Sequence, residues 1–306
     1  MIKKECFTTE WIEQVSSELH YNDKNLIEKV IRALSLLEML VKAGCPLVFK
    51  GGTALMLILG KSAHRLSIDI DVICPPGTNI EDYLKSFADF GFINLELVER
   101  KQRDDADIPK SHSKFFYQIA YRNDTDAQSY ILLDVLYEDI HYFQTRQIAI
   151  DCPFIRLEGE PLMVTVPSAE DILGDKLTAF APNTTGIPYY KNGRSCSMEI
   201  AKQLYDVGRL FENVSGLQIT SEAFRKIALV ELSYRSLGTD IGQVFNDIRQ
   251  TALCISTRGK AGEGDFDLIQ DGIIRVKSFM YKQRYQIDNA IIDAARAAYL
   301  ATLIEK

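Results

Sequence analysis

The stretch Phe49–Pro75, FKGGTALMLILGKSAHRLSIDIDVICP, decides the fold of this chain. Its second part begins at Ser67 and alternates polar and apolar residues, a period of two that is typical of a half-buried strand. Because successive side chains of a strand point to opposite faces, Asp69 and Asp71 are expected on one face. Two carboxylates at this spacing lie roughly 6–7 Å apart and repel each other, so they favour a divalent cation with oxygen ligands.

The first part of the stretch is a glycine turn. Gly51-Gly52-Thr53 follows an apolar run at 46–49 and opens a helix-like run at 54–59. A helix N-terminus that follows a glycine turn exposes backbone N–H groups, which favour a phosphate. Alone, a glycine pair usually marks a tight turn, and two alternating aspartates usually mark a solvated strand face. The combination predicts metal-dependent nucleotide chemistry.

These motifs resemble a known superfamily, the nucleotidyltransferases of DNA polymerase β type, in which a glycine turn precedes a D-x-D strand. More narrowly, GGTAL at 51–55 followed by R-x-S-x-D-x-D at 65–71 resembles the AbiEii/AbiGii-type toxin nucleotidyltransferases of abortive-infection and type IV toxin–antitoxin systems. The resemblance covers roughly residues 46–210. Sixteen residues separate Gly52 from Asp69, more than is usual in the superfamily, so an extra helical turn or a longer loop is expected.

The composition is that of an ordinary globular protein of 306 residues, with 46% hydrophobic and 25% charged residues. No apolar run is long enough to span a bilayer and no signal peptide is recognisable, so we expect a cytoplasmic protein without a membrane partner. The six cysteines stand singly, which argues against a structural zinc site and a disulfide framework. With a net charge of −7, any binding of RNA requires a local basic patch.

The hydrophobic periodicity changes near Pro167, from strands to helices. We therefore expect the α+β fold class, with a polymerase β-type nucleotidyltransferase domain and small mixed sheet over residues 1–166, a helical domain over 167–306 and the nucleotide between them. The polar stretch 100–113 is expected to be a solvated loop or hairpin tip, and 123–126 a hairpin turn. Helices are expected at about 25–43, 79–90, 168–180, 197–212, 220–235, 239–256, 265–281 and 287–304, and strands at 46–50, 67–74, 92–98, 114–121 and 130–136.

A third carboxylate stands in the apolar strand 130–136. Asp134 is costly to bury there unless it is paired or binds a metal; the alternative is an aspartate on an edge strand or one that is hydrogen-bonded. The resemblance implies that the third metal carboxylate sits on a strand next to the D-x-D strand, and Asp134 fits this position. Together with Asp69 and Asp71, it would hold Mg²⁺ or Mn²⁺.

Two residues of the helical half are singled out by the resemblance. Lys176 lies beside an apolar stripe, where a lysine is most often a surface residue; the resemblance implies instead that it acts on the NTP triphosphate, whose charge an ammonium group offsets. The segment 202–210, KQLYDVGRL, resembles the closing motif R-D-x-Y-D, with Gln203 in place of the first aspartate. Asp206 would orient the lysine or the substrate; the alternative is a surface ion-pair set with Lys202 and Arg209.

The resemblance implies a Mg-dependent nucleotidyltransferase with two metal ions between the α-phosphate and the incoming hydroxyl. Gly51, Gly52 and Thr53 would hold the β- and γ-phosphates through backbone N–H groups and the threonine hydroxyl. Arg65 and Ser67 would steady either the triphosphate or the loop that carries the aspartates.

The acceptor and the partners are also expectations from the resemblance. The first candidate is the 3′-hydroxyl of an RNA, namely tRNA, with protein and small-molecule acceptors left open, and a cognate antitoxin or its gene is an expected partner. Two other readings compete: a metal enzyme of another class, such as a nuclease or glycosyltransferase, and an NTP-binding interaction protein that has lost catalysis. Lys176 discriminates, because a nuclease has no γ-phosphate whose charge must be offset.

Overall fold

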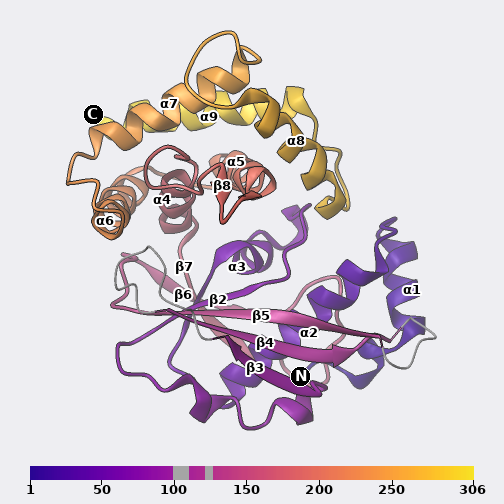
Figure 1. The fold of residues 1–306 in the computed structure, drawn as a ribbon. Helices are drawn as coiled ribbons and strands as arrows, with labels where there is room; N and C mark the ends of the chain where they lie inside the picture. The colour runs from indigo at the N-terminus through magenta and orange to yellow at the C-terminus, as the bar shows by residue number, and fades with distance from the viewer. Residues whose placement is uncertain (99–109, 121–126) are drawn as a thin grey trace.

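The computed structural model describes residues 1–98, 110–120 and 127–306 (Figure 1). Its centre is a mixed sheet of five strands in the order β1-β2-β5-β4-β3. The pair β2–β5 is parallel and the other three pairs are antiparallel. The strands are β1 (Val48–Lys50), β2 (Ile70–Cys74), β3 (Asn94–Val98), β4 (Lys110–Gln118) and β5 (Gln128–Tyr137). The small mixed sheet expected from the sequence is confirmed.

One face of the sheet packs on the first two helices, α1 (Thr9–Glu18) and α2 (Lys24–Lys42). Thr8 and Asp23 cap these helices by accepting hydrogen bonds from backbone N–H groups. Alternate residues of the strands, among them Val72 and Leu133, are buried in this core. The opposite face of the sheet is therefore turned toward helix α3 (Gly51–Leu59) and the second half of the chain (Figure 1).

The second half begins after the two-stranded sheet of β6 (Thr145–Ala149) and β7 (Met163–Pro167) and is mainly helical, as expected. It has its own apolar core, to which α3 contributes Leu55. The presence of these two cores supports the expected domain boundary between residues 166 and 167, and this boundary stays a prediction. No helix in the described parts of the chain is long and apolar enough to cross a membrane. The elements are α4 (Ala169–Ala179), β8 (Tyr190–Lys191), β9 (Arg194–Ser195), α5 (Ser197–Phe211), α6 (Gln218–Tyr234), α7 (Gly242–Ser256), α8 (Phe266–Val276) and α9 (Ile287–Glu305).

Two expectations about local structure are wrong. The helix expected at 79–90 is a pair of 3-10 helices, η3 (Ile80–Tyr83) and η4 (Phe87–Phe90). A 3-10 helix brings residues three apart to the same side, so the apolar residues at both ends of each reach the core. Residues 110–113, expected in a loop, belong to β4, because pairing with β5 satisfies their backbone. The rest of that stretch and the turn at 123–126 lie outside the described residues.

The strand that carries the aspartates is shorter than expected, beginning at Ile70 instead of Ser67. The segment before it is hydrogen-bonded to the connection between α8 and α9 of the helical half: Leu66 N donates to Phe279 O at 2.8 Å, and His64 O accepts from Tyr281 N at 3.0 Å. The residues between the glycine turn and Asp69 thus include a 3-10 turn, η2 (Gly60–Ser62), and an extended segment that joins the two halves. An extra helical turn or a longer loop was expected in this place.

Candidate active site

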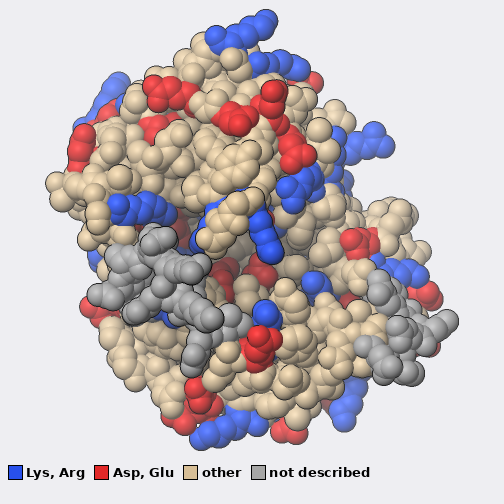
Figure 2. All heavy atoms as spheres, viewed as in Figure 1, with Lys and Arg blue, Asp and Glu red and all other residues tan. Residues whose placement is uncertain are grey.

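A row of ionisable side chains crosses the sheet. Asp71 on β2 is the register partner of Lys50 on β1 and of Asp134 on β5, and Asp134 is the partner of His112 on β4. Directly paired residues project from the same face of a sheet, so the four side chains stand side by side. Asp69 precedes the row and is exposed. Figure 2 shows this side of the molecule hollowed between the helical part and the sheet, with acidic side chains in the hollow and basic ones at its border.

The carboxylates of this row repel one another. Burial, followed by the neighbouring charges of Asp134 and Asp69, raises the pKa of Asp71 to about 7, against the lowering effect of Lys50 and Lys176. A divalent cation between these carboxylates would remove the repulsion. The donor chemistry of the row therefore fits such an ion.

The backbone spacing of Asp71 and Asp134 also suits a metal ion, but their side chains do not point as they would around a bound ion. Neighbouring strands hold Asp71 and Asp134 about 4.8 Å apart at the backbone. However, one Asp134 oxygen is hydrogen-bonded to His112 Nδ1. In the described ranges, no three Asp, Glu, His or Cys side chains are grouped closely enough to hold a metal.

The raised pKa of Asp71 predicts how stability depends on pH. Between an unfolded-state pKa near 4 and the folded-state value of about 7, the folded protein binds more protons, so stability falls as pH rises. In metal-free protein, we expect Asp71→Asn to raise the unfolding free energy by about 2–4 kcal/mol at pH 8 and hardly at all at pH 4. Thermal unfolding in chelator at both pH values measures this; equal stabilisation at both would contradict it.

The glycine turn brings the start of α3 against the carboxylates. Gly51 has φ +80°, and a Cβ on it would lie 2.1 Å from Asp71 Oδ2. A Cβ on Gly52 would lie 2.6 Å from Ser67 Oγ. Only glycine permits this approach. Since the N-cap residue Lys50 makes no side-chain capping bond, the first N–H groups of α3 remain available to an anion.

The hydroxyl of Thr53, expected to hold a phosphate, has another function in the structure. Thr53 is fully buried, and its Oγ1 donates its only proton to the backbone carbonyl of Asp69 at 2.7 Å. A hydroxyl used in this way cannot donate to a phosphate as well. In this structure Thr53 therefore positions the first aspartate, and the expected phosphate contact through its side chain stays a prediction.

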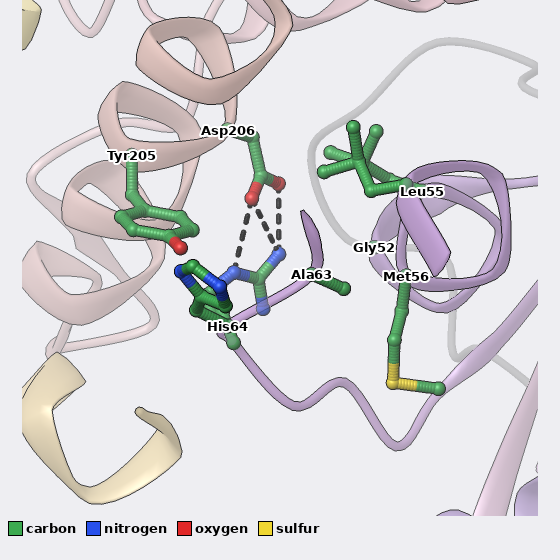
Figure 3. A pocket seen from close by; sticks show the side chains of 9 residues that line it. Gly52, Leu55, Met56, Ala63, His64, Tyr205 and Asp206 are labelled. Carbon is green, nitrogen blue, oxygen red and sulfur yellow. Dashed lines mark hydrogen bonds and ion pairs between the residues drawn. The ribbon is translucent and has the colours of Figure 1, made fainter. Parts of the chain in front are cut away.

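A buried ionic network joins the two halves beside this turn (Figure 3). Asp206 of α5 accepts from Arg65 Nε at 3.0 Å and from Arg65 Nη2 at 2.7 and 2.9 Å. Lys176 Nζ of α4 lies 2.9 Å from Asp206 Oδ2 and donates to Gln203 Oε1, also at 2.9 Å. The expected pairing of Lys176 with Asp206 is confirmed. Gln203, which stands in place of the first aspartate of the family motif, accepts this hydrogen bond from the lysine.

The same network bears on two alternatives left open by the sequence. Arg65 also donates to Leu66 O, so in this structure its guanidinium holds the loop, and a contact of Arg65 with the triphosphate stays a prediction. Asp206 is only 1% exposed, which excludes the surface ion-pair reading. Burial alone would raise the pKa of Asp206, but Arg65 and Lys176 outweigh it and hold that pKa below its usual value. The carboxylate is therefore ionised.

Other residues of the site were not singled out from the sequence. Lys50 Nζ lies 3.5 Å from Asp175 Oδ2, which also accepts from the Tyr142 hydroxyl at 2.8 Å. Adjacent residues of α4 thus serve two networks, Asp175 at β1 and Lys176 at α5. The signal for Lys50 was its place at the end of a strand before the glycine pair. His112 had no signal, because it fell in a stretch interpreted as loop.

A glycine turn, paired strand carboxylates and a lysine supplied by a second, helical part are the arrangement of the nucleotidyltransferase class. The family model for the nucleotidyl transferase AbiEii toxins of type IV toxin–antitoxin systems matches residues 33–294, so the chain belongs to this family and is a nucleotidyltransferase. The family generally uses an NTP and a divalent metal, and it implies an antitoxin partner.

Solved structures resemble the chain in fold. MenT4, a nucleotidyltransferase toxin from Mycobacterium tuberculosis, is 14% identical with a TM-score of 0.51, over 96% of this chain and 89% of that one. JHP933 from Helicobacter pylori is 15% identical with a TM-score of 0.43, over 99% and 93%. At these identities the likeness concerns the fold alone. No curated protein sequence matches the chain.

Proposed function

We propose that this toxin-family enzyme is Mg-dependent, with Asp69, Asp71 and Asp134 as the metal ligands, and transfers a nucleotide from an NTP to the 3′-hydroxyl of an RNA, namely tRNA. The observation that carries the proposal is the contact of Gly51 with Asp71, which brings a phosphate cradle and the metal carboxylates together. A bound divalent metal would offset phosphate charge and stabilise the departing pyrophosphate.

The chain's own groups each have a part in this reaction. The first N–H groups of α3 hold phosphate oxygens, and the dipole of the helix adds to their attraction. The ammonium group of Lys176 has three protons, of which Asp206 and Gln203 engage two, so a third is available to the triphosphate. Its charge already acts on Asp71. Arg65 and Thr53 keep the segment before β2 in place, which fixes Asp69.

The proposal also includes the antitoxin. The family implies an antitoxin partner, and we propose that the chain has either this antitoxin or its gene as a binding partner. Of the competing activities, a nuclease gives no reason for a buried lysine opposite the carboxylates. An NTP-binding protein without catalysis would keep the same residues, so activity itself must be measured.

The test is incubation with each labelled NTP, Mg²⁺ or Mn²⁺ and total RNA, followed by a denaturing gel. We expect label from one NTP in the size range of tRNA, dependent on metal and absent with an Asp69→Ala, Asp71→Ala double variant. Label in protein or in a small molecule would replace the RNA acceptor with another. Binding of NTP without transfer to any acceptor would instead indicate an NTP-binding interaction protein that has lost catalysis.

A further inference from the structure

We propose that the open end of the sheet beside the carboxylates is the acceptor subsite, where Tyr130 stacks on a base of a single-stranded RNA and Lys29 and Lys114 contact its phosphates. The proposal rests on the function proposed above and names the surface that would recognise the acceptor.

The register of the sheet places these residues on the same face as the carboxylate row. Tyr130 is four residues before Asp134 on β5, and side chains two apart in a strand share a face. Phe116 on β4 is the register partner of Tyr130, and Lys114 is the partner of Leu132. The aromatic pair and the lysine therefore continue the surface that carries Asp134.

This end of the sheet is open on the side of β2. Because β2 begins at Ile70, opposite Leu133, it does not cover the earlier residues of β5. The Tyr130 side chain is 44% exposed. Lys29 reaches it from α2, with Nζ 5.7 Å from the ring centroid, and Lys114 Nζ lies 5.5 Å from the same centroid. The exposed ring therefore has two ammonium groups over it, both on flexible side chains that can turn toward phosphates.

Such a surface has the chemistry of a single-stranded nucleic acid site. Bases stack on aromatic rings, and lysines beside the ring attract phosphates. The ring of Phe116 lies against that of Tyr130, with the centroids 5.7 Å apart and the planes tilted by 54°, and supports the tyrosine from the neighbouring strand. With a net charge of −7, attraction of RNA depends on local charges of this kind. Glu96 Oε2 lies 3.5 Å from Lys114 and offsets part of its charge, so Lys29 is the stronger phosphate contact.

The position of the surface also fits an acceptor. Four residues of strand separate Tyr130 from Asp134 by about 13 Å, so a base on Tyr130 belongs to a nucleotide before the terminal one. An RNA strand lying on Tyr130 would thus direct its 3′ end toward the aspartates.

The test compares acceptors of two lengths. For an oligoribonucleotide acceptor, we expect Tyr130→Ala to raise KM about 5- to 150-fold, the range of a lost stacking contact, with KM for the NTP unchanged. Tyr130→Phe should retain the wild-type KM. A mononucleotide acceptor, which has no nucleotide before the terminal one to lie on Tyr130, should react equally with all variants. Tyr299→Ala, which removes an exposed tyrosine of α9, is the matched control.

Binding gives a readout independent of catalysis. Fluorescence anisotropy with a labelled oligoribonucleotide should show weaker binding for Tyr130→Ala, and a smaller salt dependence for the Lys29→Gln, Lys114→Gln variant. The deoxyribonucleotide of the same sequence should depend on Tyr130 equally, since stacking does not read the 2′-hydroxyl. If wild type transfers nucleotide to RNA and Tyr130→Ala has normal KM and binding, the subsite is wrong and the proposed function stands. If wild type neither binds RNA nor transfers to it, both are wrong.

Discussion

Replacing Asp69 or Asp71 by alanine is expected to reduce nucleotide transfer by at least about 10³-fold, equivalent to about 4 kcal/mol of transition-state stabilisation, while the protein stays folded. The expected loss is this large because the proposed metal needs both carboxylates, and Asp71 stands directly beside Asp134. Transfer of label from NTP to RNA, measured at saturating Mg²⁺, checks the result.

The structure explains why the fold should survive. The contact that fixes the loop at Asp69 uses the backbone carbonyl, which alanine retains. Removal of Asp71 relieves repulsion among the carboxylates, so the metal-free variant should be at least as stable as wild type at neutral pH. Asp151→Ala, the loss of an exposed aspartate after β6, is the matched control and should transfer normally. Normal transfer by a folded Asp69→Ala, Asp71→Ala double variant would eliminate the metal site.

Lys176→Ala is expected to lower transfer about 10²–10³-fold and to weaken NTP binding, with metal binding at the aspartates largely retained. The reason is that the triphosphate carries about four negative charges, more than one Mg²⁺ neutralises. Lys176→Arg should restore only part of the activity, because a planar guanidinium is larger than the ammonium group held by Asp206 and Gln203. Titration with Mn²⁺ and with a labelled NTP separates the two kinds of binding.

The fold of the Lys176 variant is protected by a second partner. Asp206 keeps its two-pronged contact with Arg65, so the alanine substitution leaves no buried carboxylate without a counter-charge. In Asp206→Ala, by contrast, Arg65 and Lys176 lose their shared partner, and this variant should unfold at lower temperature. If Lys176→Ala transferred nucleotides normally, the role of the helical half in binding the triphosphate would be wrong.

The sequence allowed the motif-bearing elements to be predicted because their signals are local. Alternation of residues around Asp71 and the glycine pair before α3 depend on neighbours within a few positions, and the change of periodicity near Pro167 is equally local. The boundary of β2 was less predictable. Residues 67–69 continue the alternation of β2 but lie outside the strand, and the segment just before them is hydrogen-bonded to residues 279–281, which no local pattern reveals.

The residues of the candidate site also fall into two groups, those predicted from the sequence and those whose place depends on the tertiary structure. The sequence by itself predicted the glycine turn and the pair Asp69 and Asp71, because their residue types and spacing suit phosphate and a metal, and the family resemblance implied Asp134 and Lys176. Only the tertiary structure decided what Arg65 and Thr53 do, since a guanidinium or hydroxyl binds whichever acceptor the fold presents first. It also placed His112 and Lys50 in the row of Asp71 and Asp134, because register between strands distant in sequence is set by packing of the whole sheet.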